Sequence, residues 1–176
     1  YVDKGAVSVK CIWAMRPDGS ASSEIYGNDI PLPPTMIQAA AIPGAPNKYV
    51  ILGTPHYPQN ALGTVIRLDM NLPIRPTDPM TYMTPYVDVR REGGWHFRRP
   101  DNPEEWYVDY SGSGPLFREP FPLDEKHFLV AHKPGGMGTC YEPDGYGLYL
   151  LDETGKVEPL YRDTEISCWQ PTPLRP

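Results

Sequence analysis

Short apolar runs separated by polar turn residues make up most of this chain, and their spacing predicts strands rather than helices. Three segments, 12–19, 65–72 and 148–155, align without gaps. Each is a short apolar run that leads into a turn of Asp, Asn or Gly type. Gly19 and Gly155 end the first and third segments, and we expect both to adopt the positive φ that a tight hairpin turn needs.

An apolar strand of a second type precedes two of these segments. Residues 47–53 and 125–131 each begin with polar turn residues and continue as an apolar run. The stretches upstream of them, 36–43 and 116–123, each close with a Pro-containing turn. The repeating unit therefore reads as outer strand, turn, inner strand, loop, strand, turn and strand. Four antiparallel strands within about 40 to 50 residues are typical of one blade of a β-propeller.

The copies start at residues 12, 65 and 148, so the two spacings are 53 and 83 residues. The first spacing fits one blade. The second fits one blade with a long insertion, or two blades of which one is degenerate, and the six Pro of residues 73–114 favour the insertion. The sequence thus predicts an all-β fold. We expect a partial β-propeller of about three blades of antiparallel strands over residues 1–176, a single domain or a fragment of one, with an inter-blade loop insertion at 73–114.

Composition and charge narrow the classes of protein further. Pro (23) and Gly (16) are too frequent among 176 residues for a helical bundle, because an interior Pro costs a helix about 3 kcal/mol. A hydrophobic content of 40% argues against disorder. The net charge of −6, without a basic stripe, argues against nucleic-acid binding. The longest apolar run, 49–53, is far too short to span a membrane.

The predicted insertion has an unusual composition. Residues 90–99 combine four Arg with Trp and Phe, and 106–110 add three more aromatic residues. Aromatic residues and Arg are enriched at binding hot spots. We therefore predict a binding surface formed by Trp95, His96, Arg98, Trp106 and Tyr107. The structural alternative is a loop held against the propeller by its own aromatic side chains, as in a packed Ω-loop.

Two histidines are candidate metal ligands. His56 follows an inner strand, and His132 occupies the comparable place in the last blade, so both could lie near the same rim. Their registers differ, since His56 comes seven residues after Tyr49 and His132 four after Phe128. Each could equally be a structural, hydrogen-bonded residue. The motifs of serine hydrolases, zinc peptidases and P-loop enzymes are absent, so no catalytic residue is assigned and enzymatic activity is left open.

The cysteines and the ends of the chain bear on cofactors and processing. Cys11, Cys140 and Cys168 are an odd number without a CxxC or CxxCH motif, which excludes covalent c-type haem and a Cys-rich zinc site in this chain. One disulfide with a leftover thiol and three separate thiols both remain open. The chain begins at Tyr1 without an initiator Met or signal peptide and stops in a Pro-rich phrase, which we interpret as an excised fragment or processed product.

Four phrases of the sequence carry a resemblance to a known family. They are Trp13 to Gly19 followed by Tyr26-Gly27-Asn28; Ala41-Ile42-Pro43-Gly44 followed by a strand and His56; Glu119 to Leu123 followed by Phe128-Leu129-Val130; and Leu160 to Asp163 followed by 166–176. Together they resemble bacterial β-propeller proteins related to the middle domain of the hydrazine synthase alpha subunit, over nearly the whole chain. The last phrase is the most specific. Where relatives carry a His-His pair after the inner strand, this chain has Pro55-His56.

The resemblance implies a periplasmic or secreted multidomain protein, in which the propeller is often flanked by cytochrome-type domains that carry haem. We therefore expect a non-catalytic propeller scaffold or recognition domain of a larger extracytoplasmic protein, with no cofactor in this chain and haem only in flanking domains. The alternatives are the propeller part of a haem-dependent redox enzyme and the gating propeller of a hydrolase. The expected partners are other domains of the same chain or protein subunits.

Three blades cannot close a propeller ring. We therefore expect apolar inter-blade surface to be exposed around Trp13 and Met15 at one end and around Trp169 at the other. Either the chain self-associates through these surfaces, which we favour, or the insertion at 73–114 folds back over one of them.

Overall fold

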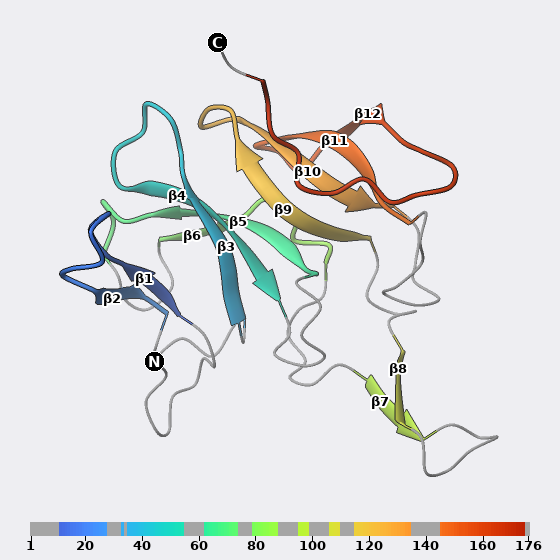
Figure 1. Cartoon of the computed structure of the whole chain (residues 1–176), viewed down its shortest axis with the longest axis horizontal. Coiled ribbons are helices and arrows are strands. Elements are labelled where there is room, and N and C mark those ends of the chain that lie inside the picture. The colour runs from blue at the N-terminus through green and yellow to red at the C-terminus, as the bar shows by residue number, and fades with distance from the viewer. Residues whose placement is uncertain are drawn as a thin grey trace.

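All strand pairs in the described part of the chain are antiparallel (Figure 1). The computed structural model describes residues 11–27, 33, 35–54, 62–73, 79–87, 115–134 and 145–174, and the backbone of 95–98 and 106–109. These residues form twelve strands and no helix, so the predicted all-β class is confirmed. The described residues therefore contain no helix that could cross a membrane.

Two four-stranded sheets form the body of the molecule (Figure 1). The first sheet contains β3 (Thr35–Ala41), β4 (Lys48–Thr54), β5 (Thr64–Asp69) and β6 (Met80–Tyr82). The second sheet contains β9 (Leu116–Pro122), β10 (His127–Lys133), β11 (Gly147–Asp152) and β12 (Val157–Tyr161). In both sheets each strand pairs with the next one in the chain, so the two sheets share one meander topology.

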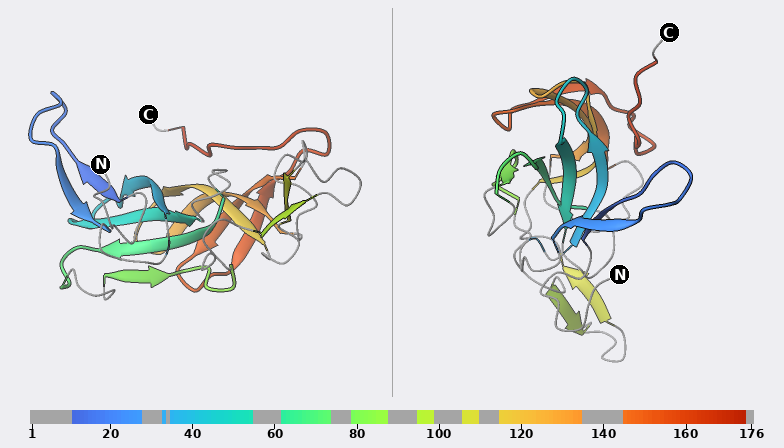
Figure 2. Two further views of the ribbon diagram at one scale, coloured as in Figure 1. Left: turned by 90° about the horizontal axis from the view of Figure 1, so that it is seen from below. Right: turned by 90° about the vertical axis from the view of Figure 1, so that its left-hand side faces the viewer.

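Two further strand pairs stand beside these sheets. The N-terminal hairpin consists of β1 (Ile12–Ala14) and β2 (Ser23–Tyr26) and packs against the first sheet. The insertion hairpin consists of β7 (Trp95–Arg98) and β8 (Trp106–Asp109). It forms a sheet of its own and extends away from the two large sheets (Figure 1; Figure 2, right).

The three aligned segments of the sequence end in equivalent turns. The N–H groups of Gly19, Leu72 and Gly155 each donate to the carbonyl three residues earlier, at 2.8, 3.2 and 3.0 Å. The φ angles of Gly19 and Gly155 are +83° and +88°, so the predicted positive φ at both glycines is confirmed. β5 and β11 are the third strands of their sheets, and β1 aligns with both.

The range 73–114 does not lie wholly outside the sheets. β6 falls within it and pairs with β5 as the fourth strand of the first sheet. The strand was not recognised because it has only three residues, in a Pro-rich stretch without alternation. The part of this range that leaves the sheet comes after β6 and contains the insertion hairpin, in the connection between the fourth strand of one sheet and the first strand of the next.

The first sheet is buried on both faces. Its front face, defined by Val50, Leu52 and Val65, packs into one core cluster with residues of the second sheet. Its rear face, defined by Ile51, Ile66 and Leu68, packs against Ile12 and Tyr26 of the N-terminal hairpin. The hairpin, the first sheet and the second sheet therefore form a stack in chain order. Figure 2, left, shows the three in this order.

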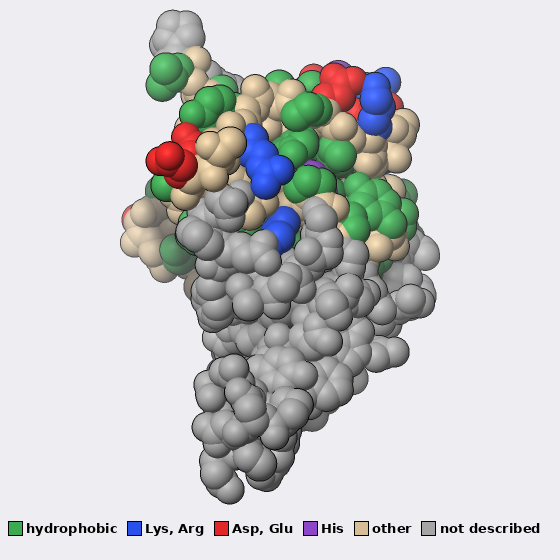
Figure 3. Space-filling view, turned by 90° about the vertical axis from the view of Figure 1, so that its right-hand side faces the viewer, with side chains coloured by type: hydrophobic (Ala, Val, Ile, Leu, Met, Phe, Trp, Pro, Cys, Tyr) green, Lys and Arg blue, Asp and Glu red, His purple; other side chains and the backbone are tan. Residues whose placement is uncertain are grey.

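The second sheet is buried on its rear face and only partly buried on its front face. Its rear face supplies Phe128, Val130, Tyr149 and Leu151 to the core shared with the first sheet. On its front face Leu116 and Ala131 are also buried, whereas four other residues that alternate with the rear residues are half-buried: Phe121, Leu129, Leu148 and Leu150. Figure 3, viewed from the side of this sheet, shows several patches of hydrophobic side chains on the described surface, with basic side chains between them and acidic side chains toward its edges.

Candidate functional site

The first strands of the two large sheets share an unusual backbone feature. Gln38 in β3 and Glu119 in β9 have φ angles of +55° and +49°, in a region that non-glycine residues seldom enter. Both occur where the strand register shifts, as at a β-bulge. A side chain in this conformation costs of order 1–3 kcal/mol, so we looked for the contacts that hold it.

The side chains at these bulges bind the backbone of the next repeat. Gln38 Oε1 accepts a hydrogen bond of 2.8 Å from the backbone N–H of Glu119. Glu119 Oε2 in turn accepts one of 2.6 Å from the backbone N–H of Gln170, whose φ is also positive, at +52°. The three residues therefore form a relay that runs from the first sheet through the second to the C-terminal segment 167–174.

Backbone contacts repeat in the same way. The N–H of Phe117 in β9 donates to the carbonyl of Gly63, which precedes β5, at 3.0 Å. The N–H of Cys168 donates to the carbonyl of Tyr146, which precedes β11, at 2.9 Å. Gly63 and Tyr146 are equivalent positions of the aligned repeats. Residues 167–174 thus lie on the second sheet as β9 lies on the first.

The sequence contains a signal for this relation that the sequence analysis did not use. Glu119-Pro120-Phe121-Pro122-Leu123 and Gln170-Pro171-Thr172-Pro173-Leu174 align without gaps. The shared pattern is short, so it identifies the C-terminal segment as the counterpart of β9 only together with the bulge geometry.

A cation–π contact holds the C-terminal segment to the second sheet. The guanidinium of Arg118 lies 4.0 Å from the ring centre of Trp169 and 5.8 Å from that of Tyr146. Its Nη2 is 3.6 Å from Glu119 Oε1, and both side chains are largely buried. Such a contact contributes about 0.5–2 kcal/mol. Trp169 itself is 49% exposed, so its ring shields Arg118 on one side while much of the ring stays in contact with solvent.

His132 is an internal residue of the core between the two sheets. Its ring stacks on Phe117 at 4.2 Å and meets Tyr149 edge-on at 4.9 Å, and its Nδ1 lies 3.0 Å from the Leu116 carbonyl oxygen. Burial lowers the pKa of the His132 imidazole to about 4, and the contact with Leu116 offsets only part of this. A neutral imidazole that donates from Nδ1 to Leu116 fits this environment.

The structure describes the other predicted site residues only in part. His56 lies outside the described residues, so its pairing with His132 at a metal stays a prediction. For the predicted binding surface, the structure places the two segments side by side: His96 pairs with Val108, Phe97 with Tyr107 and Arg98 with Trp106. The hairpin brings Trp95, His96, Arg98, Trp106 and Tyr107 into one two-stranded unit, and their role in binding stays a prediction.

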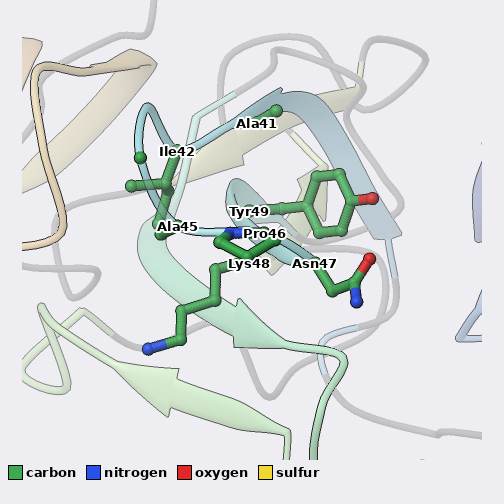
Figure 4. A pocket seen from close by; sticks show the side chains of 8 residues that line it. Ala41, Ile42, Ala45, Pro46, Asn47, Lys48 and Tyr49 are labelled. Carbon is green, nitrogen blue, oxygen red and sulfur yellow. The ribbon is translucent and has the colours of Figure 1, made fainter.

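An open pocket of about 380 Å³ lies at the turn between β3 and β4 (Figure 4). Ala41, Ile42, Tyr49 and turn residues line it, and Lys48 is its charged side chain. Lys48 Nζ forms an ion pair of 2.6 Å with Glu125, in the turn between β9 and β10, and lies 3.6 Å from Asp69. The pocket therefore offers a ligand mainly apolar surface and backbone.

Within the described part of the chain, no cluster of three His, Cys, Asp or Glu side chains could hold a metal ion. Cys11 and Cys168 are free thiols, and Cys140 lies outside the described residues. The chain matches no family model, no curated protein and no solved structure. The candidate site is the contact between successive sheets, which we call the seam. It contains the hydrogen-bonded relay of Gln38, Glu119 and Gln170.

Proposed function

We propose that this chain is a partial β-propeller that acts as a non-catalytic scaffold or recognition domain of a larger extracytoplasmic multidomain protein. The observation that carries the proposal is the repeated seam. The two large sheets share one topology and stack in chain order. The same side-chain and backbone hydrogen bonds join the first sheet to β9 and the second sheet to the extended segment 167–174. Radial repetition of one four-stranded unit is the principle of a propeller.

The recognition part of the proposal rests on the insertion hairpin. It stands apart from the stacked sheets and carries Trp95, His96, Arg98, Trp106 and Tyr107 on two paired strands. An aromatic and Arg-rich unit on a rigid scaffold suits a protein partner, such as another domain of the same protein or a separate subunit. The periplasmic or secreted location follows from the family resemblance alone.

An experimental structure of the chain tests the propeller. Superposing β9–β12 on β3–β6 should carry residues 167–174 onto β9, because one repeated rotation relates successive blades. A superposition that leaves this segment far from β9 would contradict the proposal.

Haem titration tests the scaffold function against the redox alternative. We expect the purified chain to leave the Soret band of added haemin unchanged, because haem belongs to flanking domains in this proposal. A stoichiometric Soret shift would instead favour the haem-dependent enzyme. Detection of the parent protein in the cytoplasmic rather than the periplasmic fraction of its bacterium would contradict the extracytoplasmic location.

A further inference from the structure

Arg118 is a cation that the second sheet holds largely out of water. Its side chain is only 15% exposed. Arg118 pairs with Ala131, so it lies on the front face of the sheet beside that buried residue. A guanidinium keeps its charge in a folded protein and cannot escape the cost of burial by losing a proton. Its N–H groups therefore need hydrogen-bond acceptors.

The described residues leave part of this need unmet. Glu119 supplies the ion pair of Arg118, but its Oε1 is 3.6 Å from Arg118 Nη2, which is longer than an N–H···O hydrogen bond. The other carboxylate oxygen, Oε2, accepts the backbone N–H of Gln170. Arg118 Nε is buried and has no hydrogen-bond partner. The guanidinium thus keeps donors that no described residue fills.

Two aromatic rings fix the position of this guanidinium. The ring centres of Trp169 and Tyr146 lie 4.0 and 5.8 Å from it, and the two rings meet at 81°. A ring that lies over a guanidinium contacts its flat face and leaves the N–H groups along its edge to other partners. Trp169 is half exposed, so the site borders on solvent at this ring. Figure 3 shows basic side chains between hydrophobic patches on this side of the molecule.

A carboxylate has the geometry that suits these donors. Its two oxygens accept two parallel hydrogen bonds from the edge of one guanidinium. A phosphate carries more negative charge, which the neighbouring Glu119 carboxylate and the net charge of −6 both disfavour. The surroundings of Arg118 therefore favour a planar anion with a single charge.

We propose that Arg118 and Trp169 form a binding site for a carboxylate group. Arg118 donates the hydrogen bonds, and the ring of Trp169 holds the guanidinium in place. The carboxylate belongs either to an acidic side chain of a protein partner or to a free carboxylic acid. The site is a second recognition surface beside the insertion hairpin, and it does not depend on the propeller proposal.

An NMR titration of the purified chain with sodium acetate, at constant ionic strength, tests the inference. We expect saturable shifts of the Arg118 Nε–H and Trp169 indole N–H signals. Arg118→Lys keeps the charge but loses the planar fork of donors, so it should abolish the shift at Trp169. Arg67→Lys is the matched control. Arg67 is also partly buried, but its Nη1 donates to the Glu125 carbonyl, so this variant should leave both shifts unchanged.

Two further arms sharpen the chemistry. Glu119→Gln removes the nearby negative charge and keeps an oxygen that can accept the Gln170 N–H, so acetate should bind roughly fivefold more tightly. Titration with N-acetyl-aspartate N-methylamide distinguishes the two sources of the carboxylate. Tighter binding than that of acetate favours an acidic side chain of a protein, and equal binding favours a free carboxylic acid.

Three outcomes would overturn the inference: no saturable shift in the wild-type chain, a Trp169 shift that survives Arg118→Lys, or tighter binding of inorganic phosphate than of acetate. If Arg118→Lys fails to fold, the Arg118 signal of the wild-type chain decides by itself. None of these outcomes affects the propeller proposal, which the superposition of β9–β12 on β3–β6 tests separately.

Discussion

The first and second four-stranded sheets have the same topology and similar strands but different surroundings. β4 and β10 each contain a continuous apolar run, 49–53 and 128–131, of the kind typical of strands buried on two faces. In the first sheet both faces are covered, by the N-terminal hairpin and by the second sheet. In the second sheet the rear face is covered in the same way, but the front face is buried only around Leu116 and Ala131. The comparison teaches that the apolar front residues Leu129, Leu148 and Leu150 of the second sheet are less buried than Val50, Leu52 and Val65 on the front of the first.

The largest expected effect comes from one substitution made in both sheets. Leu52→Ala in the first sheet removes a fully buried side chain and should cost about 2–5 kcal/mol of unfolding free energy, because it leaves a cavity between the sheets. Leu148→Ala on the half-buried front of the second sheet should cost about 1 kcal/mol or less. Urea unfolding of both variants measures the difference. Equal losses would mean that the front face of the second sheet is covered.

Acid should weaken the contact between the sheets through His132. Its pKa is about 4 in the folded protein and near 6.5 when unfolded, so the unfolded state binds more protons between these values and stability falls as the pH falls through this window. The loss should approach about 3 kcal/mol at the lower end. His132→Phe should remove this part of the pH dependence of urea unfolding. An unchanged slope in the variant would contradict a buried, neutral imidazole.

The two positive-φ glycines should differ in sensitivity. An added Cβ at Gly155 would clash with the carbonyl oxygen of Met83, which follows β6, whereas one at Gly19 meets open space. Gly155→Ala should therefore cost about 2 kcal/mol or more, the sum of backbone strain and a steric clash. Gly19→Ala should cost about 1 kcal/mol from strain alone. Thermal unfolding would show whether the order is reversed.

The smallest effect is local. Trp169→Ala removes the cation–π contact with Arg118 and should release the C-terminal segment without unfolding the sheets. Hydrogen exchange at the amides of Cys168 and Gln170 should accelerate, while that of Val50 and Leu52 stays slow. Acceleration throughout both sheets would show that the segment stabilises the whole stack rather than its open end.

Local chemistry explains what could be predicted from the sequence. Gly19 and Gly155 were assigned positive φ because tight turns demand it, and apolar runs bounded by Pro, Gly and Asp marked most strands of the two large sheets. The exposure of Trp13, Met15 and Trp169 followed from counting repeats. These features depend on a few neighbouring residues or on the repeat number, so a single sequence contains them.

Tertiary structure alone decided which residues meet across the seam. Gln38, Glu119 and Gln170 are separated by 81 and 51 residues, and no local preference favours positive φ at Gln or Glu. The strain at Gln38 and Glu119 is tolerated because each of these two side chains accepts a hydrogen bond from the backbone of the residue that follows in the relay, a contact that exists only once the sheets stack. Likewise β6 is too short to be recognised alone and forms because β5 offers it an edge. Long-range packing, which no local pattern encodes, selected both.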